Sequence, residues 1–121
     1  MKYVMLIYQA ENAQATATEE SMSKVLAEYT QFGTAIRESG QYLAGERLKP
    51  IATATTVRVR DGKTLTTDGP FAETREQLAG FIAIEAENLD DAIAIAARVP
   101  SAKFGSIEVR PIWVMGAPAA A

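Results

Sequence analysis

The residues that could do chemistry in this sequence centre on the segment Thr67–Phe71. Asp68 stands before Gly-Pro, where a carboxylate often hydrogen-bonds its own downstream backbone and shapes a turn. If the fold partly buries this carboxylate, Asp68 can instead serve as a catalytic general base. The turn role is the commoner of the two. Phe71 is expected to plug the core beneath the loop rather than to offer a stacking surface to a ligand.

Two charged residues follow this loop. Arg75 and Glu76 lie on a predicted short helical turn, Thr74 to Leu78, where they point to different sides. Arg75 can reach back to Asp68 as a structural ion pair, which is the favoured interpretation. Alternatively, its guanidinium can clamp a substrate carboxylate with two hydrogen bonds. Arg75 and Glu76 are therefore candidate substrate-binding residues.

Charged and aromatic residues on predicted strands complete the candidates. Arg110 shares one face of the last strand with Glu108, and Glu46 and Arg47 lie near the end of the second strand, where that strand can meet a cleft. Such charges are usually solvated or paired across strands, but in a cleft between subunits they can hold a ligand. Tyr8 can line a pocket, although packing with a hydrogen-bonded hydroxyl is the default role. Tyr8 falls on the opposite face of its strand from Tyr3.

The sequence contains no histidine and no cysteine. Ser-His-Asp and Cys-His catalytic machinery, disulfides and thiolate metal centres are therefore excluded. Any acid–base catalyst must be Asp, Glu, Tyr or Lys. A metal site would have only oxygen ligands, and no spacing of acidic residues matches a calcium loop. We expect neither a metal ion nor a cofactor.

Charge and length limit the partners. Fifteen acidic and 12 basic residues give a formal net charge of −3, which argues against nucleic-acid binding. The apolar start of the chain, residues 2–8, is too short for a signal peptide or a membrane span, so we expect a cytoplasmic protein without a membrane partner. The 121 residues suit one domain over residues 1–115 with a frayed tail at 116–121.

The hydrophobic pattern predicts the elements that must position these residues. The first strand, Lys2–Tyr8, is apolar on both faces, as is typical of a central strand. A helix follows, capped by Thr18 or by Thr16 with Glu19, and Gly40 closes it. The apolar residues of this helix recur at helical spacing and form one continuous stripe: Met22, Val25, Leu26, Tyr29, Phe32, Gly33 and Ile36.

A strand and a hairpin come next. The strand is predicted over Tyr42–Leu48. An Asp-Gly pair then separates two runs rich in Thr and Val, Thr55–Arg60 and Lys63–Thr67, which is a strong signal for a two-residue hairpin. Within the hairpin we expect Val57 and Val59 to face inward.

The last third of the chain predicts a strand, a helix and a strand. The strand covers Gly80–Ala86, and Asn88 caps the helix that follows. Pro100 marks the end of this helix. The final strand is predicted over Ser106–Val114. The apolar stripe of the helix consists of Leu89, Ala92, Ile95, Ala96 and Val99.

This order predicts an α+β protein of the ferredoxin-like kind, β-α-β-β-α-β with a β-hairpin insertion. Two helices would cover one face of the antiparallel sheet. The other face would carry three apolar side chains of the first strand, together with either Phe81 and Ala83 or Ile82 and Ile84. Such a bare patch exceeds what a monomer normally exposes, so we expect a homodimer through the helix-free sheet face.

The segment Thr67–Phe81 resembles the signature of the DGPF branch of the YCII-related family. The opening Met1–Tyr8, the stretch Thr53–Gly62 and the segment Phe104–Pro111 are also similar to that family, so the resemblance spans nearly the whole chain. It implies a dimeric α/β barrel with a cleft near the Asp68–Phe71 loop. Related barrels include enzymes, degradation-pathway proteins and small-molecule binders. The resemblance also links genes of this branch to adjacent genes for extracytoplasmic sigma factors.

The sequence departs from the better-studied YCII relatives at a pair of residues. Those relatives carry a histidine on the first helix and an aspartate before the proline that follows the second helix, and a catalytic role has been suggested for the pair. This chain has no histidine, and Val99 precedes Pro100. The acid–base pair is therefore not carried over.

Three functional hypotheses remain. The first is an enzyme acting on an unknown small molecule, with Asp68 or Glu46 as base and Arg75 or Arg110 as anion clamp. The second is a non-catalytic ligand-binding or regulatory module, in one version linked to a sigma-factor system. The third is a dimer with a purely structural role, which the sequence permits without favouring it. The fold by itself does not separate the first two.

Overall fold

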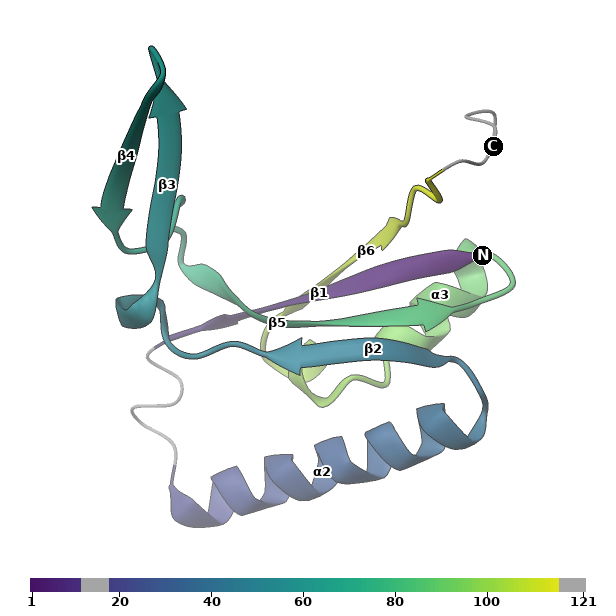
Figure 1. The fold of residues 1–121 in the computed structure, drawn as a ribbon. Coiled ribbons are helices and arrows are strands. Elements are labelled where there is room, and N and C mark those ends of the chain that lie inside the picture. Colours follow the sequence, from purple (N-terminus) through teal and green to yellow (C-terminus); the bar gives the residue numbers. More distant parts are fainter. Residues whose placement is uncertain (12–17, 116–121) are drawn as a thin grey trace.

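The computed structural model describes residues 1–11 and 18–115, and shows an antiparallel sheet with helices on one side (Figure 1). Across the sheet the strands run in the order β2 (Tyr42–Arg47), β5 (Glu76–Glu85), β1 (Lys2–Ala10) and β6 (Ser106–Pro111). Every neighbouring pair is antiparallel. This is the strand order of a ferredoxin-like fold, so the predicted fold class and the central place of the first strand are confirmed.

Strand alternation divides the sheet into two faces. The core lies on the helix side, where Tyr3, Met5 and Ile84 are almost fully buried. Phe81 and Ala83 lie on the opposite face, because they pair with Leu6 and Val4 rather than with the buried residues of β1. The buried apolar residues of the core are Tyr3, Met5, Ile7, Phe32, Ile36, Ile84, Ala86, Ala92, Ile95, Ala96 and Val99.

Helix α3 (Leu89–Ala96) packs tightly on this core. The Asn88 side chain caps it by accepting a hydrogen bond of 2.9 Å from the backbone N–H of Asp91, as predicted. Pro100 comes after the helix and begins a short 3₁₀ helix, η2 (Pro100–Lys103). The buried side chains of α3 are Ala92, Ile95 and Ala96.

Helix α2 (Glu19–Glu38) begins and ends at the predicted signals. The Thr18 hydroxyl accepts a hydrogen bond of 3.0 Å from the Ser21 N–H and so caps the helix. Gly40 has φ +78°, the left-handed conformation that glycine adopts at least cost. The alternative cap at Thr16 lies outside the described residues.

Only the C-terminal half of α2 packs on the core. Phe32 and Ile36 are buried, whereas Met22 and Leu26 are 52% and 64% exposed. The predicted apolar stripe is therefore present, but its N-terminal half does not reach the sheet. In Figure 1, α2 lies along one face of the sheet. Among the described residues, no helix combines the length and the apolar character that a bilayer crossing requires.

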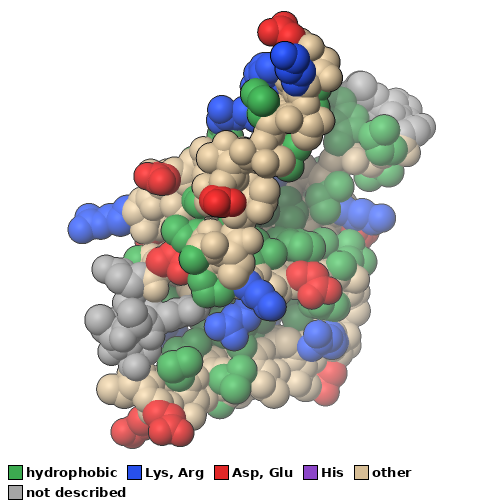
Figure 2. Space-filling model, turned by 60° about the vertical axis from the view of Figure 1, so that its left-hand side comes forward, with side chains coloured by type: hydrophobic (Ala, Val, Ile, Leu, Met, Phe, Trp, Pro, Cys, Tyr) green, Lys and Arg blue, Asp and Glu red, His purple; other side chains and the backbone are tan. Residues whose placement is uncertain are grey.

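The predicted hairpin is confirmed as β3 (Thr55–Arg60) and β4 (Lys63–Asp68). Asp61 and Gly62 both have positive φ, 53° and 74°, as a two-residue turn between twisted strands requires. The hairpin rises from the sheet on the side away from α2 (Figure 1). Figure 2 shows Lys and Arg side chains near its far end and hydrophobic side chains in the hollow beneath it.

The expected inward orientation of Val57 and Val59 is wrong for a single chain. Each is 59% exposed, because the hairpin forms its own two-stranded ribbon and projects away from the four-stranded sheet. A ribbon of two strands is only marginally stable in water without further packing. The hairpin therefore leaves apolar side chains exposed to solvent in the single chain.

The predicted helical turn from Thr74 to Leu78 is also wrong, because β5 already begins at Glu76. Its first residues pair with the end of β1, with Gln77 opposite Gln9. This pairing supplies the backbone hydrogen bonds that a helical turn would have supplied. The last strand is shorter than expected and ends at Pro111, and the predicted frayed tail lies outside the described residues.

Candidate functional site

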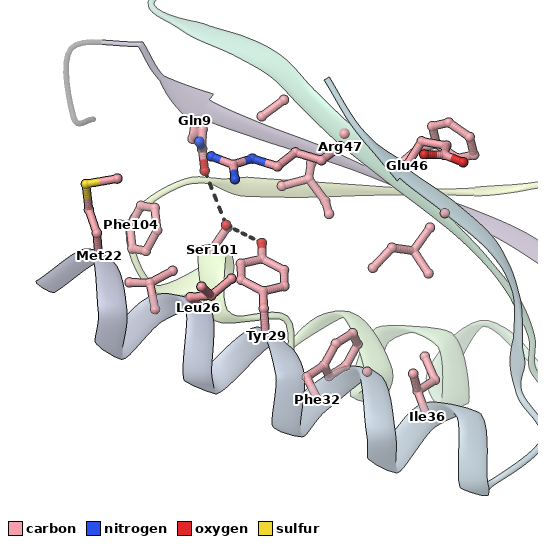
Figure 3. A pocket seen from close by; sticks show the side chains of 18 of the residues that line it. Gln9, Met22, Leu26, Tyr29, Phe32, Ile36, Glu46, Arg47, Ser101 and Phe104 are labelled. Carbon is pink, nitrogen blue, oxygen red and sulfur yellow. Dashed lines mark hydrogen bonds between the residues drawn. The ribbon is translucent and has the colours of Figure 1, made fainter. Parts of the chain in front are cut away.

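A cavity of about 820 Å³ lies between α2 and the helix-side face of the sheet (Figure 3). Its walls come from β1, β2, β5, α2, η2 and Phe104, so distant parts of the chain meet there. The volume falls within the range of roughly 300–1,000 Å³ that small-molecule sites occupy. We refer to this space as the α2 cavity.

Three glycines explain why the α2 cavity is open. Gly33 lies on α2, while Gly45 and Gly80 lie on the adjacent strands β2 and β5, and all three line the space. A Cβ atom at Gly80 would come within 2.7 Å of the Glu46 carbonyl oxygen, so this position requires a glycine. Because neither wall has side chains at these positions, the apolar residues of α2 find no partner across the gap.

The lining of the α2 cavity is mainly apolar. Met22 and Leu26 face it from the N-terminal half of α2, and Phe32 and Ile36 close its inner end (Figure 3). Phe104, which follows η2 and is 51% exposed, lies opposite Met22. The apolar stripe predicted for α2 thus serves two purposes, core packing at one end and cavity lining at the other.

A chain of three polar side chains crosses the α2 cavity. Tyr29 on α2 is hydrogen-bonded to Ser101, and the Ser101 hydroxyl donates to Gln9 Oε1 at 3.3 Å (Figure 3). Ser101 has one proton, which it gives to Gln9, so the Tyr29 hydroxyl must donate to Ser101 Oγ. As a result, the Gln9 amide nitrogen makes no hydrogen bond within the described residues, and the Tyr29 oxygen keeps its capacity to accept.

Four charged residues line the α2 cavity, and their surroundings differ. The Arg37 guanidinium stacks 4.4 Å from the centre of the Tyr42 ring. Glu19 is the exposed first residue of α2. Glu46 pairs with Phe81, so its side chain lies on the helix-free face and its backbone borders the cavity.

Arg47 is the fourth charged residue. Arg47 follows Glu46 in β2, and successive side chains of a strand point to opposite faces of the sheet. The Arg47 side chain therefore extends to the helix side, toward the part of the cavity where Gln9 lies (Figure 3). Within the described residues, the Arg47 guanidinium makes no ion pair. It is a positive charge at the rim of an apolar space.

Asp68 lies at the exposed base of the hairpin, not in the α2 cavity. The Gly69 N–H donates to the Ala54 carbonyl at 2.8 Å, and the Thr56 hydroxyl donates to the Gly69 carbonyl at 2.9 Å. Gly69 has φ +102°, which favours glycine there. The Asp68–Gly69 segment thus closes the hairpin through backbone groups. In the described part of the chain, the Asp68 carboxylate makes no hydrogen bond or ion pair.

The loop after Asp68 is solvent-exposed. Phe71 is 78% exposed, so the expectation that it plugs the core is wrong. The Arg58 guanidinium lies 5.5 Å from the centre of the Phe71 ring. The expected ion pair between Arg75 and Asp68 is absent from the described residues.

The remaining sequence candidates lie apart from the α2 cavity. Glu76 accepts a hydrogen bond of 2.7 Å from the Ser106 hydroxyl across the strands. Arg110 pairs with Glu108 on the same face of β6, as predicted, with 2.6 Å between Nε and Oε2. Tyr8 is half-buried on the helix-free face. Of the residues considered from the sequence, Glu46 and its neighbour Arg47 border the cavity.

Gln9, Ser101 and Tyr29 were not predicted as site residues from the sequence. One available signal was the alternation along β1, in which Tyr3, Met5 and Ile7 are buried and a polar Gln9 continues the same face. A polar residue at the end of a core-facing row calls for a hydrogen-bonding partner. Ser101, only 1% exposed, is that partner.

The chain matches the family model described as "YCII-related domain" over residues 1–116. It is also similar to a protein named "Uncharacterized protein R00369" from Rhizobium meliloti (strain 1021). The two are 36% identical over 114 residues, a stretch that covers 93% of this chain and 92% of the relative. The relative carries no functional name, so the similarity supplies a family without an activity.

Proposed function

The chain belongs to the YCII-related family, and its ferredoxin-like fold is one that hosts many unrelated functions. We propose that the protein is a homodimer and that each chain binds a small, mainly apolar molecule in the α2 cavity. The observation that carries this proposal is the cavity of about 820 Å³ with an apolar lining and a few converging polar groups. This combination is the usual form of a small-molecule site. A link to a sigma-factor system and membership of the DGPF branch stay predictions.

Binding would resolve the incomplete packing of α2. Met22 and Leu26 remain largely exposed although they belong to the same stripe as the buried Phe32 and Ile36. A ligand beneath the N-terminal half of α2 would remove apolar surface from water, and each Å² removed contributes about 25 cal/mol. The helix would then be packed along its whole apolar face.

Binding without turnover is favoured over catalysis at Asp68. The Asp68 carboxylate is exposed and lies at the base of the hairpin, away from the α2 cavity. An enzyme that uses this carboxylate as a base would need its substrate beside the hairpin. We therefore expect Asp68→Asn to leave affinity for a cavity ligand unchanged. Loss of a measurable turnover in this variant would instead support the enzyme hypothesis.

The homodimer is proposed to form through the helix-free face of the sheet. Leu6 and Phe81 pair on this face and are half-buried, with Val4 and Ala83 beside them. The hairpin rises beside this face, and its exposed valines would gain cover from a second copy (Figure 1). A dimer would thus bury two apolar surfaces that a single chain leaves open.

A thermal-shift screen with small aromatic and aliphatic alcohols, acids and amides tests cavity binding. Compounds that raise the melting temperature are then measured by calorimetry against Leu26→Glu. We expect their affinity to fall at least about tenfold in this variant, because its carboxylate intrudes on an apolar wall. Ile93→Glu is the matched control, since Ile93 is an exposed apolar residue on α3 outside the cavity. Equal affinity in both variants would exclude the α2 cavity as the site.

Sedimentation equilibrium at micromolar concentration tests the dimer. The wild-type protein should have twice the chain mass of 13.0 kDa. Leu6→Glu should sediment as single chains, because it places an unpaired charge in the proposed interface. Leu26→Glu should remain dimeric. A wild-type protein that sediments as a single chain at every concentration would contradict the proposal.

A further inference from the structure

Two of the polar residues that line the α2 cavity, Arg47 and Gln9, come from strands of the sheet, opposite the apolar side chains of α2. Arg47 and Gln9 extend toward the same part of the cavity (Figure 3). Met22, Leu26 and Phe32 form the apolar wall below them. A ligand that satisfies both regions must have a polar end and an apolar body.

Within the described residues, the side-chain groups of Arg47 and Gln9 that remain without a hydrogen-bond partner are donors. The Gln9 carbonyl oxygen is taken by Ser101, so its amide nitrogen presents two N–H groups. The Arg47 guanidinium adds several more donors and a positive charge, and no described carboxylate neutralises it. Together these groups call for an acceptor that carries negative charge.

The other charges of the lining limit how much negative charge the ligand can carry. Arg37 is engaged with the Tyr42 ring, and Glu19 adds a carboxylate at the start of α2. Only Arg47 remains to balance the ligand, so a doubly charged phosphate would leave charge uncompensated next to apolar walls. A carboxylate carries one charge, and its planar shape matches the two-pronged donor geometry of a guanidinium.

We infer that the α2 cavity takes a monocarboxylate with an apolar body, held at its head by Arg47 and Gln9. This inference rests on the proposed function, since it names the class of ligand for the same cavity. The carboxylate accepts hydrogen bonds from the Arg47 guanidinium and the Gln9 amide. The hydrocarbon body lies along Leu26 and Phe32. Octanoate is a simple probe of this class.

Calorimetric titration with octanoate, octanamide and octanol tests the inference. These probes share a chain length and differ in the head group. We expect octanoate to bind the wild-type protein at least about tenfold more tightly than octanamide, because its hydrogen bonds are charge-assisted. In Arg47→Gln this preference should disappear through weaker octanoate binding, while octanamide affinity stays the same. Raising the salt concentration should weaken octanoate binding alone.

Lys24→Gln is the matched control, because it removes the same charge from an exposed site on α2 outside the cavity. It should keep the preference for octanoate. Equal binding of octanoate and octanamide by the wild-type protein, or an unchanged preference in Arg47→Gln, would overturn the inference and leave cavity binding intact. If none of the three probes binds the folded protein, the proposed function fails as well.

Discussion

Helix α2 and the β3–β4 hairpin carry apolar side chains at the regular spacing of their elements, and a single chain leaves part of each uncovered. On α2, Met22 and Leu26 face a concave space that the sheet and Phe104 enclose. On the hairpin, Val57 and Val59 lie on a ribbon that projects from the sheet (Figure 1). The two surfaces are similar in chemistry and opposite in shape.

This difference in shape indicates different partners. A concave apolar space with a few polar groups can surround a small molecule and bury most of its surface. A projecting ribbon cannot surround anything, and only another protein surface is large enough to cover it. The difference therefore supports two separate proposals, a ligand site at the α2 cavity and a subunit contact at the hairpin.

The largest expected effect concerns the two halves of α2. Ile36→Ala should lower the free energy of unfolding by about 2–5 kcal/mol, because Ile36 is buried and its loss leaves a cavity in the core. Leu26→Ala should cost only about 0.5 kcal/mol, since Leu26 is already largely exposed. Urea unfolding at one fixed protein concentration measures both. Equal losses would mean that α2 packs along its whole length and that the α2 cavity is closed in solution.

The next effect concerns the hairpin. Val59→Glu should raise the dissociation constant of the dimer at least about tenfold, or about 1.4 kcal/mol, by placing a charge in the contact. Leu65→Glu is the matched variant, because Leu65 pairs with Arg58 and lies on the opposite face of the ribbon. Sedimentation of both variants shows which face a second copy covers. Dissociation constants equal to that of the wild-type protein in both would remove the hairpin from the interface.

A gain in stability is expected from a substitution at Gly33. Gly33→Ala should stabilise the protein by about 1 kcal/mol, because alanine favours a helix over glycine by that amount. The new Cβ would lie 2.9 Å from Arg37 Nη1, the end of a flexible side chain that can move away. Unfolding experiments measure this gain.

Gly33→Leu extends the same test to the α2 cavity. The leucine side chain should keep much of the gain in helix stability and fill the α2 cavity. The Gly33→Leu variant should therefore bind octanol at least about tenfold more weakly than the Gly33→Ala variant does. The alanine variant controls for the change in the helix. Equal octanol affinity in the two variants would show that the ligand lies elsewhere.

Local signals in the sequence predicted most of the fold. Caps at Thr18 and Asn88 and the Asp61-Gly62 turn act within a few residues of the chain, and all three are confirmed. The errors occurred where distant pairing decides the structure. The segment after Thr74 extends because it pairs with β1, and the valines of the hairpin are exposed because the ribbon leaves the sheet.

The candidate site was far less predictable than the fold. Sequence reasoning favoured charged residues in a recognisable segment, such as Asp68 and Arg75, and these are exposed near the base of the hairpin. The α2 cavity instead results from missing side chains at Gly33, Gly45 and Gly80. Periodicity identifies the apolar face of a helix, but it does not give the distance between that face and the sheet.

The most direct test of the proposed ligand site is methyl NMR of the protein titrated with octanol, an uncharged apolar probe whose binding does not require the inferred carboxylate. We predict saturable shift changes at the methyl groups of Met22, Val25 and Leu26, and none at Val57 and Val59. Saturable changes centred on the two hairpin valines, or no saturable change at any of these methyl groups, would contradict the account.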